Sequence, residues 1–162
     1  MTLAPSGPDS GPRTTGPTQL AIESPAPGTR LLRVHGVLNS GSGARLLRLL
    51  DSQLTMSRSG HNRLDAVIVD VSGIEALERG GPQALQHARY ACARHGIEFA
   101  LAGHPVGLTT ASVSLRSRLG HLRTFPTVDA ALTVVGAGAG ADDAGRVRSA
   151  LPVARAAGRE VR

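Results

Sequence analysis

Apolar and polar positions alternate along the chain in patterns that predict strands and helices. Residues 66–69 form an unbroken apolar run, which is typical of a strand buried on both faces. Residues 70–73, Asp-Val-Ser-Gly, are expected to end this strand. Further on, Gly81 is suited to cap a helix and Pro82 to occupy its first position. Functional side chains between residues 70 and 82 would then lie where a strand ends and a helix begins.

Two short strands are expected before this unit. Residues 19–24 and 30–35 have strand-like patterns, and the short turn between them favours an antiparallel hairpin. The segment 40–43, Ser-Gly-Ser-Gly, is interpreted as a flexible lead into a helix over residues 44–56. Leucines at helical spacing form the apolar face of that helix: Leu46, Leu47, Leu50 and Leu54. A strand, a helix and a strand in succession predict a right-handed parallel crossover.

Helices and strands continue to alternate in the second half of the chain. The predicted elements are, in order, a helix over 82–94, a strand over 97–102, a helix over 106–119, a short strand over 123–126 and a helix starting at 128–132. The inner side of the first of these helices is expected to carry Leu85, Ala88, either Ala91 or Cys92, and His95, and Gly96 is expected to end it. The predicted fold class is α/β, with a mixed sheet of four to five strands and helices packed mainly on one face.

Composition separates the two ends of the chain from its centre. Residues 1–18 are rich in Pro, Gly, Ser and Thr, have no apolar core of the kind a signal peptide needs, and are expected to be disordered. Residues 136–162 consist largely of Gly, Ala and Arg and are expected to be mostly disordered. One domain over residues 19–135 is left. Because no apolar run approaches the roughly 20 residues that cross a bilayer, we expect a cytoplasmic protein without a membrane partner.

The positive charge of the chain bears on its partners. The net charge is +6, and all 18 basic residues are Arg. Along the sequence these residues are spread out and form no continuous basic stripe. Two Phe and one Tyr offer little surface on which nucleic-acid bases could stack. Nucleic acid is therefore not the partner that the sequence favours.

Three segments resemble the STAS domain family, the fold of bacterial anti-sigma factor antagonists. Residues 70–73 closely match the family's Asp-Leu-Ser-Gly, and residues 78–82, Glu-Arg-Gly-Gly-Pro, occupy the place of its Asp-Ser-Ser-Gly-Leu. Residues 36–39, Gly-Val-Leu-Asn, are similar to the family's Gly-Glu-Leu-Asp. The resemblance covers about residues 19–135, the whole predicted domain.

The resemblance implies a regulatory module that docks on an anti-sigma factor, including those of the serine-kinase type, and so releases a sigma factor. In the family, the partner kinase phosphorylates the first serine of the second motif, and Arg79 stands in its place here. The usual serine phosphorylation switch is therefore expected to be absent. By the same resemblance, the partner-binding residues are Asn39, Ser72, Gly73, Glu78, Arg79, Gly80, Gly81 and Gln83.

Several alternatives stay open on the sequence alone. Arg79 either pairs with an acidic partner surface or is a solvated loop residue. Ser72 is interpreted as a turn-forming hydroxyl that bonds its own backbone, in preference to a substitute phosphoacceptor. The whole domain could also be a STAS scaffold or sensory domain in a larger signalling assembly that acts on no sigma pathway.

Catalytic and ligand-binding patterns are weak along the chain. The sequence has no nucleophile elbow and no paired carboxylates, so an enzyme is not expected. Three possible metal ligands share one predicted helix, namely His87, Cys92 and His95, but a buried Cys and a helix-end His explain them better than a metal site does. Neither a cofactor nor a metal is therefore expected.

Overall fold

A single five-stranded sheet organises the chain. The computed structural model describes residues 17–104, 117 and 119–135, and its strands follow one another in the order β1-β2-β3-β4-β5. Their bounds are β1 (Gln19–Ala26), β2 (Thr29–Leu38), β3 (Ala66–Leu77), β4 (Glu98–Ala102) and β5 (Thr124–Phe125). Strands β1 and β2 form an antiparallel hairpin, whereas all later neighbours are parallel. The predicted mixed sheet is thus confirmed, together with its hairpin and its parallel crossovers.

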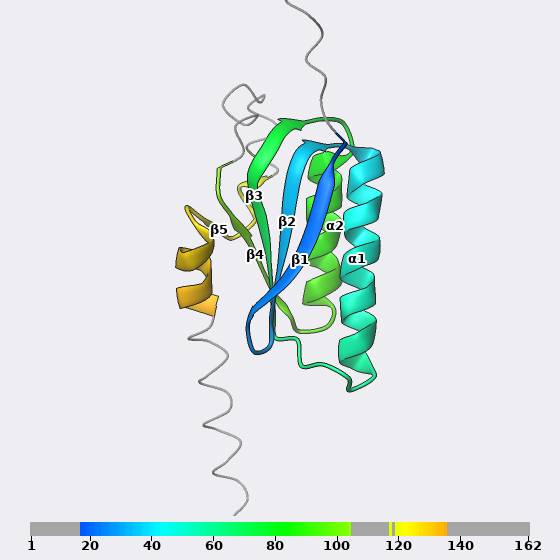
Figure 1. The fold of residues 1–162 in the computed structure, drawn as a ribbon, viewed down its shortest axis with the longest axis vertical. Coiled ribbons are helices and arrows are strands. Elements are labelled where there is room, and N and C mark those ends of the chain that lie inside the picture. Colours follow the sequence, from blue (N-terminus) through cyan, green and yellow to red (C-terminus); the bar gives the residue numbers. More distant parts are fainter. Residues whose placement is uncertain (1–16, 105–116, 118, 136–162) are drawn as a thin grey trace, which may run out of the picture.

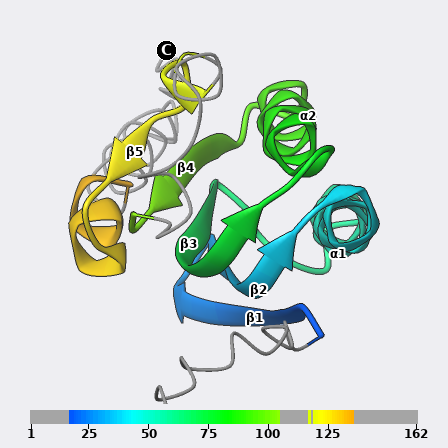
Figure 2. The ribbon, with the colours of Figure 1, turned by 90° about the horizontal axis from the view of Figure 1, so that it is seen from above.

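Helices cover the two faces of the sheet unequally. Helices α1 (Ser40–Arg58) and α2 (Gly81–Ala93) lie side by side on one face. A shorter helix over residues 128–135 lies on the opposite face, beside β4 and β5 (Figures 1 and 2). This arrangement confirms that the helices are mainly on one face. None of the helices in the described ranges is both long and apolar enough to cross a membrane.

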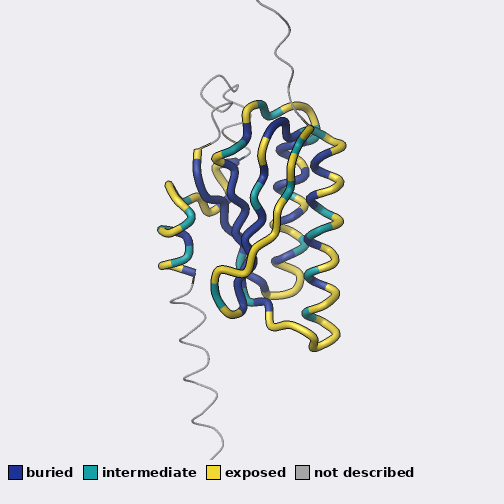
Figure 3. Tube along the Cα trace, in the orientation of Figure 1, coloured by how far each residue is buried: buried dark blue, intermediate teal, exposed yellow. Residues whose placement is uncertain are grey.

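The apolar core has two layers, and β3 contributes to both. Alternate side chains of β3, Val67, Val69 and Val71, join the cluster beneath α1 and α2. Side chains that point to the other face of β3, Ala66 and Ile68, join a smaller cluster with residues of the helix 128–135. Figure 3 shows β3 and β2 mostly in the colour of buried residues and β1 mostly in that of exposed ones. A strand with apolar contacts on both faces needs an unbroken apolar run, as the sequence predicted.

Helix α1 starts four residues earlier than the pattern of leucines predicted. The side-chain oxygen of Asn39 accepts hydrogen bonds from the backbone N–H groups of Gly41 and Ser42, at 3.0 and 3.1 Å. In return, the hydroxyl of Ser42 accepts a bond from the Asn39 N–H at 2.9 Å. This reciprocal capping fixes the first turn. The interpretation of residues 40–43 as a flexible lead is therefore wrong, because capping bonds and not apolar spacing start the helix.

Strand β3 is longer than predicted. It does not end at residues 70–73 but continues to Leu77. Beyond Asp70, β3 stays paired with β2 through two irregularities in register, with Gly73 opposite His35 and Leu77 opposite Leu38. Ser72 and Gly73 consequently lie inside a strand and not in a loop. Turn-forming residues predict a strand end locally, but here the long neighbour β2 supplies hydrogen-bond partners as far as Leu38.

The remaining predictions differ from the structure by small amounts. The N-cap of α2 is Gly80, with φ +93°, and not Gly81. His95, expected on the inner side of α2, is exposed just beyond the end of the helix. Strands β4 and β5 and the helix starting at residue 128 are where the sequence predicted them. The predicted helix 106–119 lies outside the described residues except for positions 117 and 119, and so do the predicted tails except for residues 17 and 18.

Candidate docking surface

The carboxyl ends of β2 and β3 bring most of the predicted docking residues together. The N–H of Glu78 donates a hydrogen bond to the Leu38 carbonyl at 2.9 Å, so the two strand ends are directly joined. Asn39 follows Leu38 as the cap of α1, and Gly80 follows Glu78 as the cap of α2. The group consists of Asn39, Ser40 and residues 78–83, and we refer to it as the helix-start edge. Of the eight predicted docking residues, it contains all but Ser72 and Gly73.

Glycines allow the two helix starts to approach each other closely. A Cβ atom on Gly80 would lie 2.7 Å from the Cα of Ser40, and one on Gly81 would lie 2.4 Å from the Leu38 carbonyl oxygen. One turn into α1, a Cβ on Gly43 would lie 2.6 Å from the Cβ of Ala84. These distances are shorter than carbon–carbon and carbon–oxygen contacts allow. The Gly80-Gly81 pair is thus explained by close packing of the backbone at this edge.

Arg79 projects from the helix-start edge into solvent. Arg79 is exposed, and so are Glu78 before it and Gln83 in the first turn of α2. Among the described residues, the Arg79 side chain forms no hydrogen bond or ion pair. The first turn of α2 contains no acidic residue, and its cap Gly80 has no side chain to accept a bond. The guanidinium and the positive end of the helix dipole therefore both favour an anion here.

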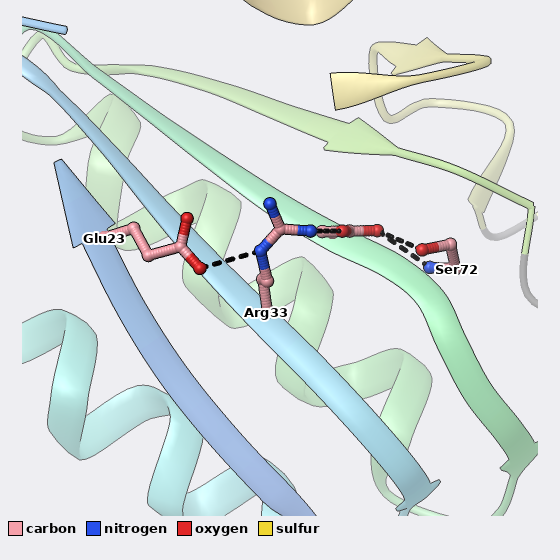
Figure 4. A network of polar contacts seen from close by, with 4 residues as sticks. Glu23, Arg33 and Ser72 are labelled. Carbon is pink, nitrogen blue, oxygen red and sulfur yellow. Dashed lines mark hydrogen bonds and ion pairs between the residues drawn. The ribbon is translucent and has the colours of Figure 1, made fainter. Parts of the chain in front are cut away.

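Ser72 lies on the side of the sheet opposite α1 and α2 (Figure 4), and Gly73 follows it within β3, so both lie away from the helix-start edge. The Ser72 hydroxyl donates a hydrogen bond to the Asp70 carboxylate at 2.6 Å, and the Ser72 N–H donates another at 3.0 Å. Asp70 also accepts a bond from the Arg33 guanidinium at 2.8 Å, and Arg33 in turn bonds Glu23 at 2.8 Å. The sequence predicted that the Ser72 hydroxyl bonds its own backbone. In the structure it donates to the Asp70 carboxylate instead.

This polar network is a part of the sheet that the sequence analysis did not anticipate. The side chain of Asp70 is only 6% exposed, and a buried carboxylate is costly unless it is paired and hydrogen-bonded. The pKa of Arg33 is raised above its ordinary value, mainly by the hydrogen bond with Glu23 and to a smaller extent by the negative charges of Glu23 and Asp70. The network crosses three strands, β1, β2 and β3, so only their register reveals it. Its hydrogen bonds give the buried Asp70 carboxylate the partners it needs on this face of the sheet.

Gly73 has a steric role beside this network. A Cβ atom on Gly73 would lie 2.2 Å from Nδ1 of His35, the residue opposite it on β2. The side chain of His35 thus occupies the space that any other residue at position 73 would need. Close packing against His35 explains why residue 73 is a glycine. This packing does not support the prediction that Gly73 belongs to the docking surface.

An apolar pocket lies between β3, β4 and α2. No titratable side chain lines it, so it offers shape and apolar contact but no acid–base chemistry. Its lining residues are Val71, Ile74, Leu77, Leu85, Leu101, Gly103, Leu119 and Thr124.

Metal-ligating and nucleophilic side chains do not converge in the described part of the chain. No group of three His, Cys, Asp or Glu side chains is placed to hold a metal ion there. Cys92 is fully buried, whereas His87 and His95 are exposed. Burial raises the pKa of the Cys92 thiol to about 12, so the thiol is protonated at neutral pH and is a poor nucleophile. Cys92 is thus a core residue of α2.

Comparisons with known proteins identify the fold. No family model matches the chain, and no curated protein sequence matches it. Among solved structures, an anti-sigma factor antagonist from Mycobacterium paratuberculosis is similar with a TM-score of 0.59 and 19% sequence identity, over 74% of this chain and 94% of that one. A variant of RsbS from Moorella thermoacetica has a TM-score of 0.55 and 14% identity, over 75% of this chain and 97% of that one.

The same architecture also occurs as part of a longer chain. The structure of SLC26A9 is similar with a TM-score of 0.55 and 14% identity, over 74% of this chain but 21% of that one. At these identities the likeness concerns the fold. The five-stranded mixed sheet, its hairpin and its paired helices α1 and α2 are therefore a STAS-like α/β fold, the fold of anti-sigma factor antagonists.

Proposed function

We propose that the protein is a regulatory binding module that binds an anti-sigma factor in the cytoplasm and so releases a sigma factor, without a serine phosphorylation switch. The STAS-like fold supports a binding module but does not by itself choose the partner, because the fold also occurs within SLC26A9. The observation that carries the proposal is Arg79, exposed and without an ion pair to any described residue, at the helix-start edge. The proposal assigns no catalytic reaction to the protein.

The charge at position 79 decides how binding could be regulated. A phosphoserine would add about −1.5 to −2 charges to a docking surface. Arg79 has no hydroxyl for a serine kinase to phosphorylate and has the opposite charge, so a serine kinase cannot introduce such a negative charge at this position. Docking at the helix-start edge is thus constitutive or is regulated by the amount of the protein.

A second candidate is a STAS scaffold or sensory domain in a larger signalling assembly. The likeness to SLC26A9, where the fold makes up a fifth of a longer chain, favours this class. Co-purification from the native cell separates the two candidates. Recovery of an anti-sigma factor supports the first, whereas recovery of a multi-component assembly without one supports the second.

Incubation with a kinase-type anti-sigma factor and ATP should leave residues 72–83 unphosphorylated. Ser72 is the only hydroxyl-bearing residue in this range, and its Oγ is held by the buried Asp70 carboxylate, which would repel a phosphate. Peptide mapping by mass spectrometry measures the labelling. The Arg79→Ser variant is the matched positive control, because it restores a hydroxyl at the exposed position. Stoichiometric phosphate within residues 72–83 of the unmodified protein would overturn the proposal of an unswitched module.

The Arg79→Glu variant should bind the anti-sigma factor about tenfold more weakly than the unmodified protein, because it replaces an attractive charge in the interface by a repulsive one. Isothermal titration calorimetry gives the dissociation constant. The matched control is the double variant Ser24→Glu, Thr133→Glu, which makes the same change in net charge at exposed positions away from the helix-start edge. Unchanged affinity of Arg79→Glu would make Arg79 an ordinary solvated residue and exclude it from the docking surface.

A further inference from the structure

Charge is divided unequally between the two sides of the sheet. The surface formed by α1, by α2 with its C-cap residue Arg94, and by the connection before α2 carries six exposed arginines and two exposed acids, so its net charge is 6 − 2 = +4. We call it the helix-layer surface. Its arginines are Arg45, Arg48, Arg58, Arg79, Arg89 and Arg94, and its acids are Asp51 and Glu78.

The rest of the described chain has the opposite sign. It contains four arginines and six acids, a net charge of 4 − 6 = −2. Three of these four arginines, Arg33, Arg63 and Arg123, form ion pairs with carboxylates. The fourth, Arg30, is buried and donates to the side chain of Gln53. Each of these four arginines thus has a side-chain partner and acids are in excess around them, whereas arginines are in excess on the helix-layer surface.

The six arginines of the helix-layer surface have no acidic partner among the described residues. Arg45 donates to the backbone carbonyl of Thr18 at 3.1 Å. The guanidinium of Arg94 lies over the ring of Tyr90, 5.9 Å from its centroid. Neither contact neutralises a charge. The guanidinium groups can therefore still form bidentate pairs with carboxylates of another molecule.

Exposed apolar side chains accompany the arginines. Four large apolar residues are exposed in the described chain, and two of them, Tyr90 at 66% and Met56 at 38%, lie on the helix-layer surface. Tyr, Met and Arg are enriched at protein–protein interfaces, and Tyr and Arg provide a large part of the binding energy there. One exposed aromatic ring is too few for a surface on which nucleic-acid bases stack. The composition thus favours a protein partner.

We propose that the helix-layer surface docks on an acidic surface of the partner protein, with Arg79 at one end of the contact and Arg48 and Arg89 along its length. The proposal rests on the proposed function and names the chemistry of its partner. It also gives a reason for Arg79, since an acidic partner attracts a guanidinium at the position where it would repel a phosphoserine. Complementary charge of this kind speeds association and makes it sensitive to salt.

The first test measures binding of the full chain to the anti-sigma factor recovered by co-purification. Arg48→Glu and Arg89→Glu, made separately, should each weaken binding about fivefold or more. For the unmodified protein, raising the salt to about 0.5 M NaCl should also reduce the affinity. Neither residue belongs to the helix-start edge, so their effect reports on the helix layer. The double variant Ser24→Glu, Thr133→Glu, with the same change in net charge, should bind within about twofold of the unmodified protein. Equal affinities for all variants would overturn the proposal and leave the proposed function intact.

The second test does not depend on the anti-sigma factor. A glutamate-rich peptide is titrated into the isotope-labelled full chain, and amide chemical shifts are followed by NMR. Shifts should concentrate on α1, on α2 and on the connection before α2. Shifts on the sheet side, or none, would contradict the proposal. If the anti-sigma factor fails to bind while the peptide maps to the helix layer, the proposed function is wrong and the acidic docking surface stands.

Two further probes distinguish the class of the partner. A short DNA duplex and vesicles that contain anionic phosphatidylglycerol are compared with the glutamate-rich peptide at equal numbers of negative charges. The peptide should bind at least as tightly as either, because exposed Met56 lies between Arg48 and Arg58 in the sequence and exposed Tyr90 between Arg89 and Arg94, which does not make a continuous phosphate-binding stripe. Tighter binding to the duplex or the vesicles would overturn the assignment to a protein partner.

Discussion

The Gly80→Ala variant is expected to lose about 3 kcal/mol of unfolding free energy, a large part of the stability of a domain of this size. Two effects add at this position. Gly80 has φ +93°, a conformation that costs an L-residue with a side chain roughly 1–2 kcal/mol. Its added Cβ would lie 2.7 Å from the Cα of Ser40, which is backbone and cannot rotate away. Overpacking of this kind typically costs a further 1–3 kcal/mol.

Urea denaturation followed by circular dichroism measures the loss for Gly80→Ala. The matched control is Gly60→Ala, because Gly60 also has a positive φ, +75°, but a Cβ there meets no atom within 4 Å. The control should lose only the conformational cost of about 1–2 kcal/mol. Equal losses in the two variants would show that α1 and α2 do not approach each other as closely at their starts as the structure has them.

Replacing Leu50 by Ala should reduce the unfolding free energy by about 3 kcal/mol. Leu50 is 2% exposed and belongs to the core cluster between α1 and the sheet. Truncation removes apolar contacts and leaves a cavity, because neither the sheet nor α2 can move in to fill it. Helix α1 carries Asn39 at its start and part of the helix-layer surface on its outer side, so the core beneath α1 holds the candidate docking surface in place.

Thermal unfolding of Leu50→Ala and Met56→Ala separates core packing from helix propensity. Met56 is on the same helix but is 38% exposed, and its replacement by Ala should change stability by less than about 1 kcal/mol. Below its unfolding transition, Leu50→Ala should retain the affinity of the unmodified protein for the anti-sigma factor. A similar loss of stability in both variants would mean that α1 is not packed on the core through Leu50.

Much of the fold could be predicted from short patterns. The apolar run at 66–69, the turn between the first two strands and the pair Gly80-Gly81 before Pro82 each identify an element within a few residues. These patterns identify their elements correctly because each element has a local requirement: burial on both faces for the strand, a tight turn for the hairpin and a cap for the helix start. The start of α1 was missed because Asn39 and Ser42 create it by hydrogen bonds, and these leave no apolar periodicity in the sequence.

The candidate site could be predicted in part. The resemblance to the STAS family placed Asn39 and residues 78–83 in one docking surface, and the structure joins them through the bond between Glu78 and Leu38. It also placed Ser72 and Gly73 there, but β3 continues past them and turns Ser72 toward the opposite face. The difference depends on how far β2 extends beside β3, which no local pattern in β3 records.

By itself the sequence determined the α/β alternation, the chain's positive charge and the presence of Arg79 at the position that the STAS resemblance gives to a phosphoacceptor serine. Only the tertiary structure decided where that charge lies. Six of the described arginines, scattered along the sequence, lie on α1, on α2 or next to an end of α2, while three of the four on the sheet side pair with carboxylates such as Asp70 and Glu98. The physical reason is that pairing of charges depends on distances across strands and helices, which are set when the chain folds and not by spacing along it.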